Sequence, residues 1–145
     1  MKQVLDIVRV MTPFPYTVDG SASLKQAQEM LEDYGITHLP VVDEDKLIGI
    51  TTERDVALAL EIKAICPGAR ELKVADICIK NPYTVEIGDS VLSVVSQMLN
   101  KKITSALVLK NGRLVGLFTY TNIFKLLIQF LLGKTTLSDP PDITA

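Results

Sequence analysis

The chain contains an internal repeat with a period of 67 residues, and this repeat restricts the fold more than any other feature of the sequence. Residues 15–18 align with residues 82–85 without a gap, and the match continues along the chain. Eleven of the 42 positions from 15 to 56 are identical between the copies. The chain is therefore expected to fold as two copies of one small unit. Beyond the Pro-Tyr-Thr-Val segment, the identical pairs are Ser23/Ser90, Ile36/Ile103, Thr37/Thr104, Val41/Val108, Leu47/Leu114, Gly49/Gly116 and Thr52/Thr119.

Each copy has the pattern of a short extended segment, a helix, a β-hairpin and a second helix. Apolar residues at helical spacing follow Ser23 and Ser90, and Gln26 completes a capping-box pattern with Ser23. Gly35 stands where the C-terminal cap of the first helix is expected. The predicted strands are 37–42 and 47–51 in the first copy and 104–109 and 114–118 in the second, and the second helices are predicted to begin at Thr52 and Thr119.

The same pattern predicts the domain organisation. We expect a first repeat at 1–61, a linker at 62–74 that contains Pro67-Gly68, a second repeat at 75–133 and an irregular tail at 134–145. One repeat of this size can hardly bury a core alone, whereas two repeats packed sheet to sheet could. The predicted fold class is therefore α/β (α+β), with two small sheets, each flanked by two helices, related by pseudo-twofold symmetry.

Bulk properties exclude several classes of protein. A hydrophobic fraction of 48% with 22% charged residues indicates a folded globular chain, and a net charge of −2 disfavours a nucleic-acid binder. Residues 1–10 carry charges that do not fit a signal peptide, and the apolar stretch 123–132 is too short to span a membrane. Cys66 and Cys78 fit neither a metal spacing nor a disulfide framework. We therefore expect a cytoplasmic protein.

Little in the sequence favours an enzyme or a metalloprotein. The chain has a single histidine and lacks a Ser-His-Asp or Cys-His pattern, a P-loop and a glycine-rich dinucleotide fingerprint. The acidic turn 43–45 is better explained as a solvated hairpin tip than as a cation site. We expect no catalytic residues, no metal site and no required cofactor.

A Thr-x-x-Asp/Asn pattern follows the second strand of each hairpin and is the strongest chemical signal in the chain. It comprises Thr52 with Asp55 and Thr119 with Asn122. One explanation is a capping box, although Glu or Gln is preferred at the later position. The other is a ligand site, because a helix N-terminus binds phosphate through free amides and a short carboxylate can accept both hydroxyls of a ribose. The repetition of the pattern slightly favours the ligand site.

Three successive segments of the first copy resemble signatures of the CBS domain, a regulatory domain named after cystathionine β-synthase. They are residues 10–13 (VMTP), 36–43 (ITHLPVVD) and 47–55 (LIGITTERD), and the resemblance covers about 8–62 and 75–131. It implies two copies whose three-stranded sheets pack around a pseudo-twofold axis, with two clefts for AMP, ADP, ATP or S-adenosyl compounds. It also implies that such pairs associate into flat dimers.

The resemblance also implies which residues contact the ligand. The phosphate and ribose roles map onto Thr52 with Asp55 and onto Thr119 with Asn122, and apolar side chains and main chain of the neighbouring strands would hold the base. The remaining candidates are Thr12, Ile36, Thr37, His38, Leu39, Pro40, Ile79, Ile103, Thr104, Ser105 and Leu107.

Two features of the candidates distinguish the copies. His38 is either a partly buried imidazole with a structural role or a basic group that reaches the ligand phosphate, and its counterpart in the second copy is Ser105. Asn122 replaces the acid, so that the ribose would lose a charge-assisted hydrogen bond. We therefore expect the cleft built on Thr52 and Asp55 to bind more tightly.

The predicted function is a regulatory module that senses adenosine nucleotides, with a homodimer and a regulated enzyme or transporter in trans as expected partners. The alternative is a dimerisation or protein-interaction module that has lost its ligand. The weaker motif of the second copy and the apolar helix near residue 130 are the features that favour this alternative.

Overall fold

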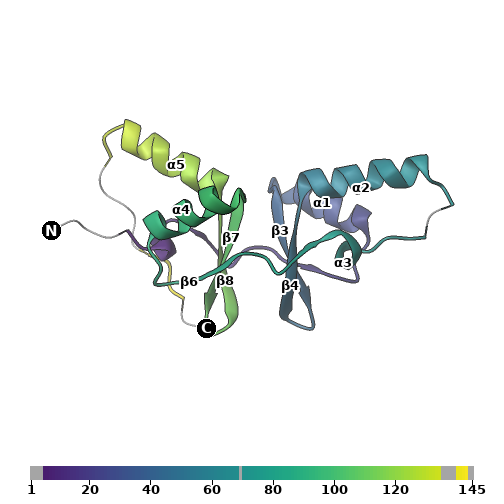
Figure 1. Ribbon diagram of the computed structural model, residues 1–145, viewed down its shortest axis with the longest axis horizontal. Helices are drawn as coiled ribbons and strands as arrows, with labels where there is room; N and C mark the ends of the chain where they lie inside the picture. The colour runs from purple at the N-terminus through teal and green to yellow at the C-terminus, as the bar shows by residue number, and fades with distance from the viewer. Residues whose placement is uncertain (1–4, 69, 135–139, 144–145) are drawn as a thin grey trace. The chain divides into compact units, whose positions relative to one another are not determined.

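The computed structural model of the chain describes residues 5–68, 70–134 and 140–143. It divides into two units (Figure 1), which are described separately. The first-repeat unit consists of Tyr16–Pro82, and the second-repeat unit combines Met1–Pro15 with Tyr83–Ala145. The unit boundaries therefore do not coincide with the ends of the sequence repeats, because a leading segment of each repeat belongs to the unit of the other repeat.

A four-stranded sheet with the order β2-β3-β4-β5 forms the centre of the first-repeat unit. β3 and β4 are the predicted hairpin, and β2 joins β3 in parallel. Helices α1, α2 and the short α3 complete the unit. The elements are β2 (Val18–Asp19), α1 (Leu24–Tyr34), β3 (His38–Asp43), β4 (Lys46–Thr52), α2 (Glu53–Ile65), α3 (Val74–Ile77) and β5 (Ile79–Lys80).

The second-repeat unit repeats this arrangement, with the sheet order β1-β8-β7-β6. Its hairpin β7–β8 has the same register irregularity as β3–β4, between the fourth and fifth residues of the first strand, at Val108/Leu109 and Val41/Val42. The elements are η1 (Ile7–Arg9), β1 (Thr12–Pro13), β6 (Thr84–Glu86), α4 (Val91–Lys101), β7 (Ser105–Lys110), β8 (Arg113–Thr119) and α5 (Tyr120–Leu131).

The fourth strand of each sheet comes from the other repeat. β5, which leads into the second repeat, pairs with β4 of the first, with Ile79 opposite Ile50. β1, which leads into the first repeat, pairs with β8 of the second, with Thr12 opposite Leu117. The resemblance to known domains implied three-stranded sheets, so this exchanged strand is a correction to the expected architecture.

A glycine in each hairpin makes the exchange possible. A Cβ atom placed on Gly49 would lie 2.6 Å from the main-chain oxygen of Ile79 and 2.8 Å from the sulfur of Cys78. At the equivalent Gly116, a Cβ would collide with the side chain of Met11. Both contacts involve the segment that crosses over from the other repeat. The identity of Gly49 and Gly116 in the sequence repeat is thus explained by the close approach of the exchanged strand.

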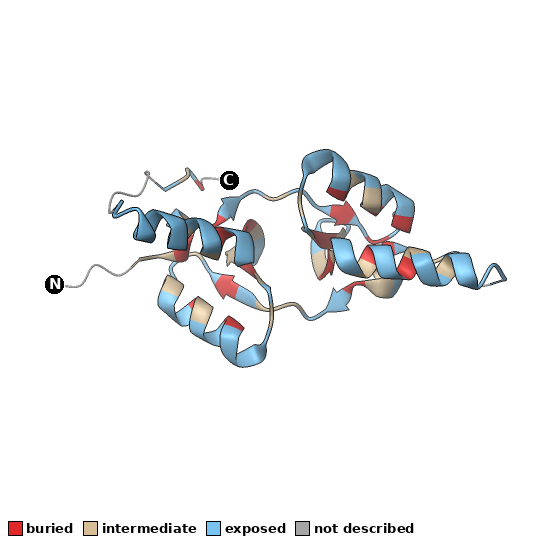
Figure 2. Cartoon of the chain, turned by 90° about the horizontal axis from the view of Figure 1, so that it is seen from above, coloured by how far each residue is buried: buried red, intermediate tan, exposed pale blue. Residues whose placement is uncertain are grey.

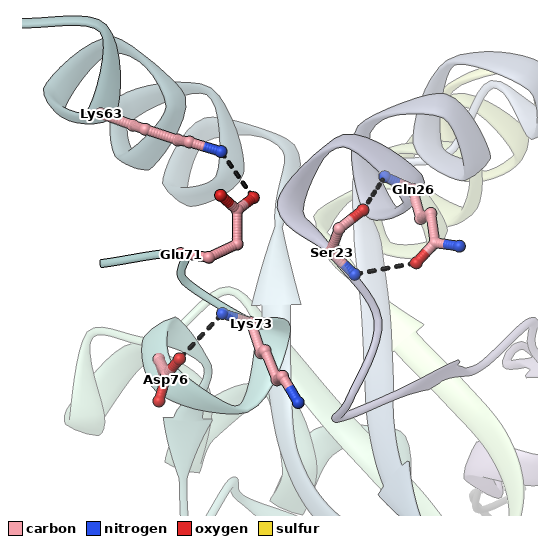
Figure 3. Close-up of polar contacts among 6 residues, drawn as sticks. All are labelled: Ser23, Gln26, Lys63, Glu71, Lys73 and Asp76. Atoms are coloured by element: carbon pink, nitrogen blue, oxygen red, sulfur yellow. Dashed lines mark hydrogen bonds and ion pairs between the residues drawn. The ribbon is translucent and has the colours of Figure 1, made fainter. Parts of the chain in front are cut away.

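The first helix of each repeat begins as predicted. The Ser23 hydroxyl accepts a hydrogen bond from the Gln26 backbone N–H at 3.1 Å, and the Gln26 side chain accepts one from the Ser23 N–H at 2.9 Å (Figure 3). Gly35 ends α1 in the left-handed conformation, with φ of 61°. In the second repeat Ser90 caps α4, and Lys102 takes the place of the glycine.

The segment predicted as a linker, 62–74, contains regular structure at both ends. α2 continues to Ile65, and α3 begins at Val74. Between them, Lys63 Nζ forms an ion pair with Glu71 at 2.6 Å (Figure 3). The backbone N–H of Lys73 donates to the Asp76 carboxylate at 2.8 Å and thereby caps α3. Of this region, residue 69 lies outside the described residues.

Each unit has its own hydrophobic core (Figure 2). In the first-repeat unit, Leu39 on β3 pairs with Thr51 on β4, whereas Ala106 pairs with Phe118 at the same place in the second. A large residue thus faces a small one in both hairpins, but on opposite strands. Met98 is 1% exposed in the core of the second-repeat unit.

The apolar helix α5 begins at Tyr120, with Thr119 as its N-cap at the predicted start, and ends at Leu131, with Gly133 following at a φ of 71°. Among the described helices, none has the length and hydropathy needed to cross a membrane. Cys78 is buried and Cys66 is exposed. In the tail, the only described residues after 134 are 140–143, and they form no regular element.

Candidate ligand-binding sites

The structure sorts the candidate residues into one group per unit. The first-repeat unit contains Ile36, Thr37, His38, Leu39, Pro40, Thr52, Asp55 and Ile79, and the second-repeat unit contains Thr12, Ile103, Thr104, Ser105, Leu107, Thr119 and Asn122. The strand exchange brings Ile79 into the first group and Thr12 into the second. Each group therefore draws residues from both repeats.

In the first-repeat unit, the end of the hairpin and the start of α2 form one polar site. His38 and Thr52 are direct partners across β3 and β4, so their side chains lie next to each other on one face of the sheet. Thr52 is the N-cap of α2, and its hydroxyl accepts a hydrogen bond from the Asp55 backbone N–H at 3.2 Å. The Thr37 carbonyl accepts from the Glu53 N–H at 2.9 Å, which fixes the start of the helix against β3.

The His38 imidazole is influenced by two opposing effects. Burial disfavours the charged ring and lowers the pKa of His38 below its ordinary value of 6.5, while the nearby Asp55 carboxylate partly raises it. The Thr37 hydroxyl lies 2.9 Å from His38 Nδ1. Since burial dominates, the imidazole is mainly neutral at pH 7. An anion bound beside it would favour the protonated form.

The strand alternation separates the apolar candidates into two kinds. Leu39 is fully buried among the side chains beneath α1 and α2, and Ile36 packs against the same core. Pro40 pairs with Ile50 on the face that carries His38. Pro40 is itself fully buried, so its side chain is not open to a ligand in this structure, and Leu39 could offer only its main chain.

Proline at position 40 also changes the edge of the sheet. In the second-repeat unit the Leu107 N–H donates to the Tyr83 carbonyl at 2.9 Å, which starts the pairing of β6 at Thr84. Pro40 occupies the place of Leu107 and has no N–H, so it cannot donate to the Tyr16 carbonyl. As a consequence, β2 begins one residue later, at Val18. Sequence reasoning did not single out Tyr16, although the Pro40/Leu107 difference is visible in the repeat alignment.

In the second-repeat unit the corresponding place is closed by Asn122, which is 8% exposed. Its Oδ1 accepts a hydrogen bond from the Thr119 backbone N–H at 2.9 Å. Its Nδ2 donates to the Val10 carbonyl at 3.0 Å and to the Thr12 hydroxyl at 3.2 Å. Both ends of the amide are thus occupied by protein groups, two of which belong to the exchanged leading segment.

Asp55 cannot make the equivalent contacts. A carboxylate has no N–H to donate to a main-chain carbonyl, and Ile79, which stands where the second-repeat unit has Thr12, has no hydroxyl. Asn122 therefore joins the exchanged segment to the helix start, whereas Asp55 retains acceptor capacity for a ligand. The two motifs therefore differ in their hydrogen-bonding partners as well as in charge.

Comparison with known proteins agrees with this architecture. The sequence profile of the CBS domain matches residues 4–62 and again 74–129. The chain belongs to the CBS domain family. It is 31% identical to a CBS domain-containing protein of Dictyostelium discoideum over 134 residues, which cover 86% of this chain and 92% of that protein. It is also 33% identical over 119 residues to homoserine O-acetyltransferase of Methanosphaera stadtmanae, but spans only 23% of that enzyme's length and 81% of its own.

Two solved CBS structures with bound adenosine compounds share the fold. A CBS domain pair in complex with 5-methylthioadenosine and S-adenosyl-L-methionine superposes with a TM-score of 0.78 at 27% identity, covering 88% of this chain and 99% of the other. CBSX2 in complex with AMP gives a TM-score of 0.73 at 26% identity, covering 88% and 98%. The chain is thus a tandem CBS pair of mixed α/β fold.

Proposed function

We propose that this CBS pair is a regulatory module that senses adenosine nucleotides, and that it binds its ligand mainly at the site built on Thr52, Asp55 and His38. The observation that carries the proposal is the contrast between the two motifs. Asn122 is occupied by Val10, Thr12 and Thr119, whereas Asp55 has no such partners available from the exchanged strand. The fold shared with AMP-bound and S-adenosylmethionine-bound CBS pairs supports the choice of ligand class.

In this proposal the polar groups at the start of α2 bind the ribose and phosphate. α2 has 13 residues, and its N-terminal amides and dipole favour a negative charge. The Thr52 hydroxyl accepts the Asp55 N–H and can still donate its own hydrogen to a phosphate oxygen. The Asp55 carboxylate accepts both ribose hydroxyls, and His38 gains a proton when the phosphate arrives.

The base is assigned to the apolar groups next to this site. Ile79 on the exchanged strand is 54% exposed and can contact the base, whereas Pro40, on the same face of the sheet as His38, is fully buried. Pro40 has no N–H and donates no hydrogen bond to the Tyr16 carbonyl. This carbonyl is therefore a suitable acceptor for the exocyclic amine of adenine. Guanine and hypoxanthine carry a carbonyl at that position, so this acceptor favours adenine over both.

The second-repeat site is assigned a weaker role. Ser105 cannot supply the charge that His38 can, and Ile103 packs against the core of its unit. A ligand there would have to displace the Asn122 hydrogen bonds to the exchanged segment. We therefore expect its occupancy, with contacts from Thr12, Thr104, Leu107 and Thr119, only at much higher ligand concentration.

A panel of adenosine compounds tests the function. AMP, ADP, ATP, S-adenosylmethionine and 5-methylthioadenosine are each added to the purified chain, with GMP as the control for the base. A ligand that binds only the folded state must raise the melting temperature, by an amount that grows with concentration. The absence of any shift would instead favour the alternative module that has lost its ligand. Mass spectrometry of the small molecules released on denaturation would identify a ligand carried through purification.

The assignment of the site is tested by titration calorimetry on two matched variants. Asp55→Asn keeps the shape of the side chain but removes the charge, so affinity for AMP should fall at least tenfold, which corresponds to about 1.4 kcal/mol. Asp43→Asn, an identical change at the exposed hairpin tip of the same unit, should leave affinity unchanged. Asn122→Ala should retain tight binding at the first site. Equal losses in Asp55→Asn and Asn122→Ala would refute the assignment.

We further propose that the partner of α5 is a second copy of the chain, so that the module is a homodimer. α5 is apolar on its outer face as well as its inner one, and Phe124, Leu127 and Leu131 are 59%, 49% and 72% exposed. Together with Tyr120, Ile128, Phe130 and Leu132, these side chains expose on the order of 700 Å² if each contributes about 100 Å². A standard interface buries about 800 Å² per partner, so α5 supplies most of what a dimer needs.

The dimer is tested by the mass of the chain in solution. Light scattering should report a dimer for the natural sequence and a monomer for Leu131→Glu. The matched control is Leu99→Glu on α4, where the exposed leucine (79%) lies outside the apolar face of α5. A dimer that survives in Leu131→Glu would place the interface elsewhere. The regulated enzyme or transporter and the cytoplasmic location remain predictions from the sequence.

A further inference from the structure

The anchor segment, Pro140–Ile143, lies far along the chain from the rest of the core that it joins. Ile143 is 7% exposed and belongs to the hydrophobic core of the second-repeat unit, together with residues such as Ile7 and Phe118. Pro140 and Asp142 are exposed, so the segment enters the core through this one side chain. Extended peptides are commonly recognised by a pocket for a side chain combined with hydrogen bonds to the main chain.

Lys110 holds the main chain of the anchor segment. Its Nζ donates a hydrogen bond to the Ile143 carbonyl at 3.1 Å. Lys110 is the last residue of β7 and is paired with Arg113 across the hairpin turn. Two positive charges opposite each other destabilise a hairpin by repulsion. A hydrogen-bond acceptor from another segment of the chain reduces that repulsion. The adjacent Asp142 brings a negative charge to the same neighbourhood.

This arrangement exists in only one of the two repeats. The counterpart of Lys110 in the first repeat is Asp43, whose pairing partner across the turn is Lys46. A carboxylate at position 43 cannot donate to a peptide carbonyl. The place that receives Ile143 is therefore a specific property of the second-repeat unit and does not follow from the shared fold.

The composition of the anchor segment suits reversible docking. Pro140-Pro141 restricts the free segment to few conformations, which reduces the entropy lost when it docks. Docking gains free energy from one buried side chain and one charged hydrogen bond. The remaining entropy cost of ordering the backbone opposes both gains. The docked state should therefore outweigh the undocked state by only a modest factor, roughly tenfold, so that docking stays reversible.

We propose that the second-repeat unit contains a peptide-binding slot, specific for an aliphatic residue that follows Pro-Pro and an acidic residue, which the chain's own anchor segment fills. The slot binds the apolar side chain in the core and the main-chain carbonyl of the same residue through Lys110. When the anchor segment is displaced, the slot accepts the same segment of a second copy. This site is separate from the proposed nucleotide site on Thr52 and Asp55.

The test uses the full chain and a labelled peptide of residues 134–145, with fluorescein at its amino end. Ile143→Asp in the protein prevents the anchor segment from docking, because a carboxylate cannot occupy the core. Fluorescence anisotropy should show saturable binding of the peptide to the Ile143→Asp protein, and at least tenfold weaker binding to the natural protein, whose slot is filled. A peptide with Ile143→Ala should bind at least tenfold more weakly than the natural peptide.

Lys110 is tested in the Ile143→Asp background. Lys110→Met should weaken peptide binding at least tenfold, whereas Lys46→Met, a similar change on the other hairpin, should have no effect. Equal binding of the two peptides, equal binding to the natural and Ile143→Asp proteins, or equal effects of the two lysine substitutions would overturn the proposal.

A folding control distinguishes a loss of peptide binding from a loss of folding. If Ile143→Asp abolishes the cooperative thermal transition, excess unlabelled peptide should restore it, and a protein that stays unfolded would overturn the proposal. Where the variant is folded, its melting temperature is also measured with and without AMP. The response to AMP reports only the proposed nucleotide site, so the two proposals can fail independently.

Discussion

The side-chain amide of Asn122 donates a hydrogen bond to the Thr12 hydroxyl at 3.2 Å, across 110 residues of the chain. The same amide nitrogen donates to the Val10 carbonyl at 3.0 Å. One side chain in the second ligand motif thus holds the segment that leads into the first repeat. The motif that would serve ligand binding in one repeat has a structural role in the other.

Asn122→Asp should destabilise the protein by about 1–3 kcal/mol, because a carboxylate would face the Val10 carbonyl and leave the buried groups unsatisfied. Thr12→Val should cost less, since it removes only one of the two bonds. Urea unfolding measures both changes. The reciprocal variant Asp55→Asn serves as the control and should be nearly neutral for stability. A neutral Asn122→Asp would show that these hydrogen bonds do not hold the exchanged segment.

The repeat pattern was sufficient to predict the hairpins, the helix starts and the presence of two copies of one unit. The capping box of Ser23 and the left-handed Gly35 follow from local side-chain chemistry, which the sequence displays directly. The strand exchange could not be predicted in the same way. β1 and β5 have two residues each, too few for a periodic pattern to indicate their partners.

The candidate site was predictable in part for the same reason. Thr52 as a helix cap follows from the motif, and the structure confirms that it caps α2. Asn122 contacts the exchanged leading segment, and Tyr16 lies beside the strand that contains Pro40. Both roles therefore depend on groups distant in sequence. Such contacts appear only when the sheet is assembled. The position of Leu39 beneath the helices also depends on the strand register, which the motif alone did not fix.

Thr51→Val should stabilise the protein by about 1–3 kcal/mol. Thr51 is fully buried, and among the described residues its hydroxyl has no hydrogen-bond partner. Valine has nearly the same shape and removes the cost of burying an unsatisfied hydroxyl. The neighbouring Thr52→Val is the matched control and should lose about 1 kcal/mol, because it removes the cap of α2. Thermal unfolding of the two variants should shift in opposite directions.

Gly49→Ala should be more damaging than Gly116→Ala. At position 49 the new methyl group would meet the main-chain oxygen of Ile79 at 2.6 Å, and backbone cannot move aside without breaking the β4–β5 pairing. At position 116 it would meet the flexible side chain of Met11, which can adjust. Gly88→Ala is the control, with no atom within 4 Å of the added methyl. Comparable unfolding midpoints for Gly49→Ala and Gly88→Ala would contradict the close approach of the exchanged strand.

The stability of the unliganded protein should decrease as the pH falls below 6.5. Burial lowers the pKa of His38 in the folded chain, whereas the unfolded imidazole keeps a value near 6.5. Between these two values the unfolded state binds more protons, so stability rises with pH in that window and becomes flat below the folded pKa. His38→Gln should remove this part of the pH dependence. Urea unfolding at pH 5 to 8 provides the measurement, and an unchanged slope in His38→Gln would assign the effect to other groups.

Binding of AMP should show the opposite preference and become tighter as the pH falls. A phosphate bound beside His38 favours the protonated ring, so its pKa is higher in the complex than in the free protein, and proton uptake accompanies binding. Affinity should therefore decrease as the pH rises through the interval between the two values. Asp55 already raises the pKa of His38 in the free protein, so Asp55→Asn should move that interval to lower pH. Calorimetry in buffers of different ionisation enthalpy measures the proton uptake directly. An affinity that stays constant between pH 5.5 and 8, with no proton uptake, would remove His38 from the phosphate site while leaving the role of Thr52 intact.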